Sequence, residues 1–487
     1  MELYELTARV LADKIKNGEV SSEEATLSVL DRIDRMEPSI HAYITVTAEH
    51  ALERARALDS KRAKGEDIGP LGGVPMAIKD SIVTRGIRTT AGSHILENYI
   101  PPYHATVIEK LVRAGAVFTG KANTDEFTMG STCETSYYGP SKNPHNTSMV
   151  TGGSSGGSAA ALAADECIAA LGSDTGGSIR QPASFCGIVG IKPTYGRVSR
   201  YGLIAYASSL DQIGPMSKTV EDAALVLSVI AGYDTRDSTC LNEPVPDYTS
   251  HVTKTVKGLK VGIPKEYFGE GIDPEVKRIS LDAAEVLASE GIELLDISLP
   301  HTEYAIPAYY LLATAEASAN LERYDGVRYG HRTKEPENLF EMYARSRSEG
   351  FGDEVKRRIM LGTYCLSAGY YDAYYRKAQK VRRLIKEDFD KALATVDAIL
   401  APVSPTPAFP LGTKINDPLQ MYLADIYTIS LNLAGLPGIS IPAGKTADGL
   451  PVGVQFMGRV LDECTLFTLG AALERSVGRI TVAGENT

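Results

Sequence analysis

Apolar residues recur at helical spacing through the first part of the chain. Residues 5–17 carry an amphipathic helical pattern, and Ser21 with Glu24 forms a capping box at the start of a second helix. A third helix is predicted at residues 48–62. We expect these helices to form an N-terminal layer, residues 1–66, on the outside of the protein.

Beyond this layer, between residues 67 and 300, short apolar runs alternate with longer amphipathic segments. Strands are predicted at residues 74–78, 116–120, 167–173, 188–192, 259–263 and 292–298, after an earlier one at 42–46. Helices are predicted between them at residues 104–114, 155–166, 220–231 and 274–290. Because strands and helices alternate, we expect an α/β fold with a central sheet covered by helices on both faces.

The pattern changes again at residue 301. Residues 301–393 are wholly helical in pattern and rich in tyrosine, which is typical of a helical cover or of a surface for a partner. Residues 394–487 return to the core, with strands at 397–400, 438–442 and 452–457 and a closing helix near 461–475. Since these last strands complete the sheet, we expect one interleaved domain over residues 1–487.

Composition narrows the class of protein. The chain has 487 residues, of which 43% are hydrophobic, so it can bury a large core. Its net charge of -11 argues against a surface that grips nucleic acid, so any contact with RNA should be indirect. No apolar run is long enough for a membrane span, and the N-terminus lacks the pattern of a signal peptide. We therefore expect a protein that does not contact membranes.

The six cysteines are scattered along the chain without a CxxC pair. This spacing predicts neither a disulfide framework nor a zinc site. Together with the absence of a signal-peptide pattern, it favours a reducing, cytoplasmic location.

Two Gly-Gly-Ser corners, at residues 152–154 and 176–178, flank the predicted helix and strand between them. Glycine admits backbone dihedrals closed to other residues and lets a ligand approach the main chain, so the serine after each pair can stand on an exposed corner. The second corner leaves a strand and enters a short predicted helix at residues 179–185. Free amides at a helix start stabilise negative charge, so Ser178 is the better candidate for a nucleophile.

A serine hydroxyl needs a base within hydrogen-bond reach, and the sequence offers more than one. The chain contains eight histidines, and residues 153–157 match G-x-S-x-G, which would make Ser155 the nucleophile with a histidine base. The polar residues at 143–150 do not resemble the core strand that this motif requires, so we interpret the match as accidental. Lys79 is another candidate base, since an ammonium in a dry site loses hydration and its pKa falls. A solvated lysine at a strand end is the plainer interpretation.

Three segments favour Lys79 as the base. They are GVPMAIKD, which contains Lys79, TGGSSGGSAA, which contains Ser154, and GSDTGGSIRQPASFCG, which contains Ser178. Together they resemble the amidase signature family, whose Ser-cis-Ser-Lys triad cleaves carboxamides. The resemblance implies the amidase signature fold, with a mixed and twisted central sheet. It makes Ser178 the nucleophile, Ser154 the bridging serine after a cis peptide bond, and Lys79 the base. It also implies an oxyanion hole formed by the backbone amides of Thr175, Gly176, Gly177 and Ser178.

Over nearly its whole length the chain resembles one group in that family, the A subunits of the glutamyl-tRNA(Gln) or aspartyl-tRNA(Asn) amidotransferases. The segments that carry this resemblance include KANTDEFTMGSTCETSYYGP, PTYGRVSRYGLIAYASSLDQIGP and MYLADIYTISLNLAGLPGISIPAG. The resemblance implies a glutaminase that hydrolyses glutamine to glutamate and ammonia, with the ammonia passing to a partner subunit. It further implies a heterotrimer with two more amidotransferase subunits, one of which uses ATP and Mg²⁺ on the misacylated tRNA. This chain would itself need no ATP, metal or other cofactor, and would meet tRNA only through the partner.

The same resemblance places the groups that bind glutamine. Arg358 would bind the carboxylate, Asp425 the ammonium, and Tyr309 would be a third contact. The alternative is that Arg358 and Asp425 are surface charges on the helical cover. Two other functions stay open: a free-standing amidase that acts on another small carboxamide, and a non-catalytic scaffold subunit of the same fold.

Overall fold

A computed structural model describes residues 2–413 and 418–482 of the chain. The strands of its central sheet are β1 (Tyr43–Val46), β2 (Pro75–Lys79), β3 (Val117–Ala122), β6 (Ala169–Asp174), β7 (Val189–Lys192), β8 (Gln212–Ser217), β9 (Lys260–Pro264), β10 (Glu293–Ile297), β11 (Ala398–Pro402), β12 (Gly438–Lys445) and β13 (Pro451–Gly458). Their order across the sheet is β1-β3-β2-β6-β8-β7-β12-β13-β11-β9-β10. A separate hairpin consists of β4 (Lys142–Asn143) and β5 (Asn146–Val150).

The strands of the sheet run in both directions. β3, β2 and β6 are parallel neighbours in one part of the sheet, and β11, β9 and β10 are parallel neighbours in another. The strands between these two groups pair antiparallel. β2 and β6 are buried at every position, as expected for parallel strands that are covered on both faces. The predicted α/β fold with a mixed sheet is confirmed.

Helices surround this sheet. Among the described residues the α-helices are α1 (Ala8–Asn17), α2 (Ser22–Ile40), α3 (Ala48–Ala63), α4 (Thr106–Arg113), α5 (Gly156–Ala163), α6 (Arg180–Cys186), α7 (Val220–Ile230), α8 (Pro274–Ser289), α9 (Ala305–Asn320), α10 (Leu339–Gly350), α11 (Asp353–Leu366), α12 (Tyr375–Leu393), α13 (Pro418–Leu423), α14 (Ile429–Ala434) and α15 (Glu463–Val477). The capping box predicted from Ser21 and Glu24 is present at the start of α2. Across the described part of the chain, no helix is both long and apolar enough to cross a membrane.

Alternate residues of β11 show how the two faces of the sheet are covered. Ala398 and Leu400 belong to a core that includes α7, α8 and α15. Ile399 and Ala401 belong to a second core that includes α9, α12 and α14. Because successive side chains of a strand point to opposite faces, the two cores lie on opposite sides of this part of the sheet.

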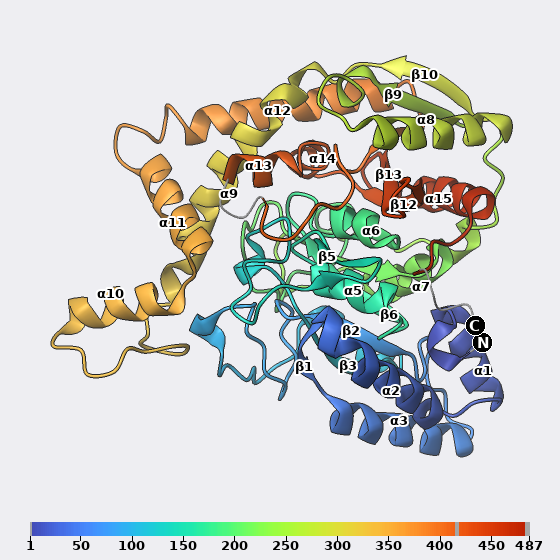
Figure 1. The fold of residues 1–487 in the computed structure, drawn as a ribbon, viewed down its shortest axis with the longest axis horizontal. Coiled ribbons are helices and arrows are strands. Elements are labelled where there is room, and N and C mark those ends of the chain that lie inside the picture. The colour runs from blue at the N-terminus through green and yellow to red at the C-terminus, as the bar shows by residue number, and fades with distance from the viewer. Residues whose placement is uncertain (1, 414–417, 483–487) are drawn as a thin grey trace.

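The segment with the helical, tyrosine-rich pattern contains α9 to α12. In Figure 1, α10 and α11 lie at the left edge of the molecule, away from the sheet. Several of their apolar side chains are exposed, among them Phe340, Met360 and Tyr364. Exposed apolar groups on neighbouring helices are typical of a surface that a partner covers.

β8 and α2 are among the elements that differ from the prediction made from the pattern. β8 is absent from that prediction because its sequence, QIGPMS, contains Gly214 and Pro215, which usually weaken a strand. In the sheet β8 is nevertheless fully buried between β6 and β7. α2 extends to Ile40, beyond the predicted end near residue 36, with Pro38 in its last turn.

Candidate active site

Lys79 ends β2, and its side chain is completely buried. Its Nζ lies 2.7 Å from Ser154 Oγ, 2.9 Å from Ser155 Oγ and 3.3 Å from the carbonyl oxygen of Ser173. The lysine nitrogen is therefore held by three neutral oxygens. None of the carboxylates that the structure describes forms an ion pair with it.

Burial lowers the pKa of Lys79 to about 7. The negative charges of Asp125, Asp174 and Asp211 act in the other direction, because they favour the protonated form, but burial outweighs them. The neutral amine is thus accessible near neutral pH, where it can take a proton. The burial expected of a lysine base is confirmed, and the interpretation as a solvated strand-end lysine is wrong.

The corner that carries Ser154 is fixed from two sides. The peptide bond between Gly153 and Ser154 is cis, as the resemblance implies. Gly153 N donates a hydrogen bond of 2.9 Å to Gln181 Oε1, and Ser155 N donates one of 3.1 Å to the carbonyl oxygen of Ser178. The second bond joins the two Gly-Gly-Ser corners to one another.

Ser155 is buried and supports its neighbours. Its hydroxyl accepts a hydrogen bond from Lys79 Nζ and another, of 3.2 Å, from Ser173 N, and it lies 3.1 Å from Ser173 O. It follows β5, which belongs to the separate hairpin and is largely exposed. A nucleophile elbow requires a core strand before its serine, so the context of Ser155 does not fit the G-x-S-x-G motif.

Ser178 stands on the second corner, between β6 and α6, and is 7% exposed. The oxyanion-hole residues predicted with it are only partly free. Gly177 N donates a 2.8 Å hydrogen bond to Asp174 Oδ1, so the expectation that all amides of this corner are unpaired is wrong for Gly177. The amides of Thr175, Gly176 and Ser178 donate to no residue that the structure describes. These three amides remain available to a negative charge beside the Ser178 hydroxyl.

Asp174 holds this corner rigid. It forms a fully buried ion pair with Arg180, with 3.1 Å between Arg180 Nε and Asp174 Oδ2, and it accepts a 2.8 Å bond from Asn432 Nδ2. Although burial opposes it, the charge and hydrogen bonds of Arg180 keep the pKa of Asp174 low, at about 2. The sequence does not indicate a role for Asp174 and Arg180, because their other partners, Asn432 and Gln455, lie more than 250 positions along the chain.

Arg358 lies on α11 and is 2% exposed, so it is no surface charge. Its Nε donates a 2.8 Å bond to Glu354 Oε1, and its Nη1 donates one of 2.8 Å to the hydroxyl of Tyr206. The guanidinium also lies over the rings of Tyr206, Tyr310 and Tyr422, at 5.3 to 5.5 Å from their centroids. Its remaining nitrogen, Nη2, is buried without a partner among the described residues.

Asp425, which follows α13, is 7% exposed. Its Oδ2 accepts a hydrogen bond from Ser131 Oγ, whereas its Oδ1 is buried without a partner in the described part of the chain. Burial raises the pKa of Asp425 to about 8. The turn after Asp425 is bonded to the corner that carries Ser178, because Thr428 Oγ1 donates a 2.6 Å hydrogen bond to the carbonyl oxygen of Gly176.

Tyr309, the third predicted substrate contact, packs against the same corner. A Cβ added to Gly176 would lie 2.8 Å from the Tyr309 hydroxyl, so the ring and the backbone of the corner are in close contact. At the next position Gly177 has a φ of 134° and faces Thr428, which leaves no room for a side chain. Glycine at these positions therefore lets the tyrosine and the threonine approach the main chain.

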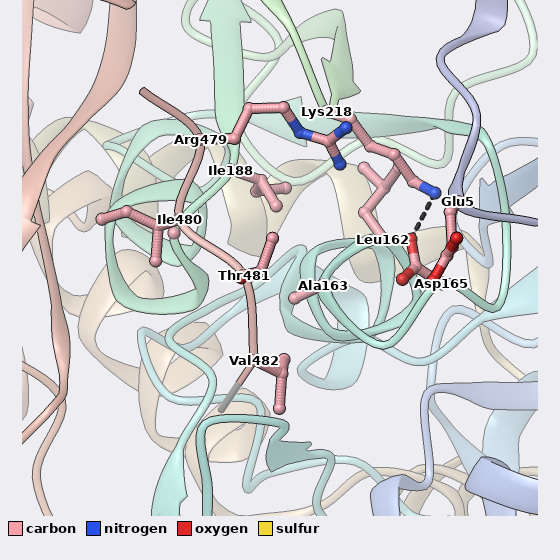
Figure 2. A pocket seen from close by; sticks show the side chains of 11 residues that line it. Glu5, Leu162, Ala163, Asp165, Ile188, Lys218, Arg479, Ile480, Thr481 and Val482 are labelled. Atoms are coloured by element: carbon pink, nitrogen blue, oxygen red, sulfur yellow. Dashed lines mark ion pairs between the residues drawn. The ribbon is translucent and has the colours of Figure 1, made fainter. Parts of the chain in front are cut away.

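Figure 2 shows a cavity outside the candidate active site. It has a volume of about 220 Å³ and is lined by Leu162, Ile188 and residues 479–482, among others. Its charged groups include Lys218 and Asp165, which form an ion pair with one another. Since these charges satisfy each other and no predicted site residue lines the cavity, we do not assign catalysis to it.

The sequence profile of the amidase family matches residues 24–467. The chain belongs to the amidase family. Its relatives include proteins named as the A subunits of glutamyl-tRNA(Gln) amidotransferases. The one from Carboxydothermus hydrogenoformans is 62% identical over 98% of both chains, and the one from Syntrophus aciditrophicus is 59% identical over 98% of both chains.

Solved amidase structures share the fold over nearly their whole length. The A subunit of the glutamyl-tRNA(Gln) amidotransferase of Thermotoga maritima matches with a TM-score of 0.82 and 42% identity, covering 99% of both chains. The native peptide amidase of Stenotrophomonas maltophilia matches with a TM-score of 0.83 and 30% identity, also over 99% of both chains. Proteins with different names thus share this fold, so the fold alone does not determine the substrate.

Proposed function

We propose that this amidase hydrolyses glutamine to glutamate and ammonia as the A subunit of a tRNA-dependent amidotransferase. A partner subunit uses the ammonia to convert Glu-tRNA(Gln), Asp-tRNA(Asn) or both to the amide. The observation that carries the proposal is that Arg358 Nη2 and Asp425 Oδ1 are buried without a partner among residues 2–413 and 418–482, in a chain that also holds a serine-lysine centre. The names of the relatives, at up to 62% identity, support it.

In the first step Ser178 attacks the side-chain amide carbon of glutamine. The proton of its hydroxyl passes through Ser154 to neutral Lys79, which the 2.7 Å contact between Lys79 and Ser154 supports. Negative charge develops on the amide oxygen, and the free amides of Thr175, Gly176 and Ser178 stabilise it. The carbon-nitrogen bond then breaks, and the proton returns from Lys79 to the departing ammonia.

The second step releases glutamate. Water attacks the glutamyl ester on Ser178 and gives up a proton to the neutral Lys79 through Ser154. When the ester bond breaks, that proton returns to the oxygen of Ser178, and the triad is restored. Each proton therefore moves between groups of this chain, water and the substrate.

Recognition of glutamine rests on its two charges. Its carboxylate accepts hydrogen bonds from Arg358, whose planar guanidinium suits a carboxylate. Its ammonium donates to Asp425, and a positive charge there brings the pKa of Asp425 down from about 8. Tyr309, which packs on Gly176, is the third contact in this proposal.

Assembly with two further amidotransferase subunits as a heterotrimer is part of the proposal. The exposed apolar side chains on α10 and α11 support a partner surface at the edge of the molecule. The net charge of -11 supports tRNA contact through the partner, and ATP and Mg²⁺ are expected to be used there as well.

The test compares glutamine with a small neutral amide, using the protein alone and together with co-expressed partner subunits. The proposal predicts a strong preference for glutamine and ammonia transfer to charged tRNA in the complex. A preference for the neutral amide, with no co-purifying subunits, would instead support a free-standing amidase. Assembly without hydrolysis of either amide would support a scaffold.

A further inference from the structure

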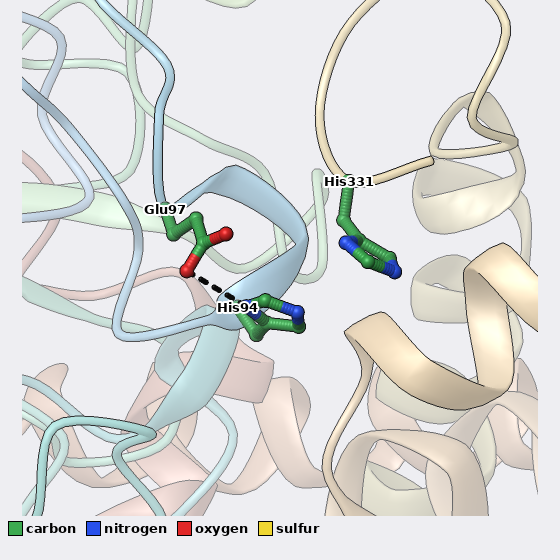
Figure 3. Close-up of side chains that lie close together, drawn as sticks. All are labelled: His94, Glu97 and His331. Carbon is green, nitrogen blue, oxygen red and sulfur yellow. Dashed lines mark ion pairs between the residues drawn. The ribbon is translucent and has the colours of Figure 1, made fainter. Parts of the chain in front are cut away.

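Three side chains with metal-binding chemistry, none of them part of the proposed triad, lie close together. His94 belongs to the short 3-10 helix η2 (His94–Leu96), Glu97 follows directly, and His331 comes from the loop before α10. One ligand atom from each lies within 4.8 Å of the others. Figure 3 shows the imidazole of His94 between the carboxylate of Glu97 and the ring of His331.

The contact between His94 and Glu97 is unusual. Glu97 Oε2 lies 2.9 Å from His94 Nδ1, yet this buried nitrogen has no hydrogen-bond partner in the described chain, so the oxygen is not in line with the ring N–H. Ligand atoms that share a cation at about 2.0–2.1 Å lie about 2.9–3.4 Å apart, with their lone pairs aimed at a common point. The spacing and the misalignment therefore both fit two ligands of one ion.

The position of His331 is fixed by its own loop. His331 N donates a 2.7 Å hydrogen bond to the carbonyl oxygen of Ile95 in η2. The two imidazole rings stand with their centroids 4.4 Å apart. His331 Nε2 is 2.8 Å from Glu349 Oε2, which leaves Nδ1 for a cation while the carboxylate orients the ring.

We propose that His94, Glu97 and His331 bind a divalent transition metal ion of the zinc class. Two imidazoles and one carboxylate are a ligand set that zinc accepts, and the three side chains are partly exposed, so water can complete the coordination. Small rotations of the rings bring the three ligand atoms from within 4.8 Å to the spacing of a bound ion.

This site is structural, and it connects the core to the helix that carries Arg358. Ser93, the residue before His94, donates hydrogen bonds to Glu126 and to the carbonyl oxygen of Gly350. Glu126 Oε2 in turn accepts a 2.8 Å bond from Gly352 N at the start of α11. An ion that joins η2 to the loop of His331 would therefore stabilise the position of the N-terminal end of α11. It takes no part in the proposed amide chemistry.

The experiment uses the full chain with any subunits that co-purify, stripped with a chelator and dialysed against zinc chloride. We expect one zinc per chain and a rise in melting temperature on zinc binding. Glu97→Gln and His331→Ala should each raise the Kd at least tenfold and remove the rise, whereas the exposed His50→Ala serves as a matched control and should bind normally.

Replacement of zinc by Co²⁺ gives a second readout, since a protein-bound, low-coordinate Co²⁺ absorbs visible light. The absorbance should appear in the parent protein and in His50→Ala, and should be lost in His331→Ala. Two results would overturn the proposal: zinc uptake well below one ion per chain, or equal affinity in the parent, Glu97→Gln and His331→Ala proteins.

Discussion

We call the groups around Lys79 and Ser178 the reaction centre, and Arg358 with Asp425 the recognition pair. The two regions differ in whether every polar atom of their buried charged side chains has a hydrogen-bond partner within the described chain. In the reaction centre, Lys79 Nζ has three oxygen partners, and both carboxylate oxygens of Asp174 accept hydrogen bonds. In the recognition pair, Arg358 Nη2 and Asp425 Oδ1 are buried without a partner among the described residues. Lys79 and Asp174 thus find their partners within the chain, whereas Arg358 and Asp425 each keep one atom that a substrate could satisfy.

The unpartnered atoms of the recognition pair affect the free energy of substrate binding. A buried polar atom without a partner costs about 1–3 kcal/mol, and more when it is charged. A substrate with a carboxylate and an ammonium recovers that cost, while a neutral amide does not. On the proposed function, the reaction centre is held in a fixed arrangement and glutamine supplies the missing partners of Arg358 and Asp425.

The largest effect is expected from a substitution in the reaction centre. Ser178→Ala removes one hydroxyl from a 7% exposed corner and no core volume, so the fold should persist. Hydrolysis of both glutamine and a neutral amide should fall by about 10⁴-fold or more. Steady-state ammonia release measures it, with the exposed Ser148→Ala as matched control. Turnover near the parent rate would remove Ser178 from the mechanism.

Lys79→Arg should be about as damaging as Lys79→Ala, with kcat lowered by about 10³-fold or more. The reason is that a guanidinium keeps its proton at accessible pH and cannot act as a base. Since the side chain is completely buried, Lys79→Met serves as a variant of similar size, and its melting temperature checks the fold. An arginine variant that kept most of its activity would reduce Lys79 to an electrostatic role.

Arg358→Ala and Asp425→Asn should break the recognition pair and leave the reaction centre intact. Loss of one partner of a desolvated ionic contact costs about 2–5 kcal/mol, so KM for glutamine should rise from about thirty-fold to more than a thousand-fold. Hydrolysis of the neutral amide should change little. The exposed Arg383→Ala is the matched control. Equal losses on both substrates would show that these residues support the triad or the fold instead.

The pH dependence sharpens the comparison. Protonated Lys79 cannot accept a proton, so kcat/KM for the neutral amide should fall about tenfold per unit below the pKa of Lys79, at about 7. Glutamine also needs charged Asp425, whose pKa is raised to about 8, so its kcat/KM should continue to rise up to that pH. In both cases activity is gained as pH rises. Asp425→Asn should remove the second rise, and identical profiles for both substrates would contradict the assignment.

The smallest effect concerns Ser155. Ser155→Ala removes one of three oxygen partners of Lys79 but neither proposed serine of the triad, so kcat should fall by about tenfold, equivalent to one hydrogen bond. Both substrates should be affected alike, because the contact lies in the reaction centre. A complete loss of turnover, with an unchanged melting temperature, would return Ser155 to the role of nucleophile.

The sequence predicts the reaction centre better than it predicts the burial of the recognition pair. The alternation of strands and helices is a local pattern, so it predicts the α/β sheet, and the compact motifs around Lys79, Ser154 and Ser178 single out the reaction centre. The pattern does not predict β8, because Gly214 and Pro215 are unusual in a central strand. β8 is stabilised by its neighbours in the sheet, β6 and β7.

Long-range contacts explain the remaining differences. Arg180 bonds to Gln455 and Asn432, which lie hundreds of positions away, so no local pattern predicts the hydrogen bonds that hold the corner of Ser178. The bond from Gly177 N to Asp174 likewise depends on the side-chain rotamer that this network fixes. Arg358 and Asp425 resemble surface charges in their local sequence, and only the packing of α11 and the segment after α13 reveals their burial.

The most direct test of the account is covalent trapping with an electrophilic analogue of glutamine that keeps both α-carbon charges, followed by peptide mass spectrometry. The account predicts one adduct on Ser178, slowed by glutamine, absent in Ser178→Ala and formed much more slowly in Arg358→Ala. An adduct on Ser155, or labelling of Ser178 at the same rate in Arg358→Ala, would contradict it.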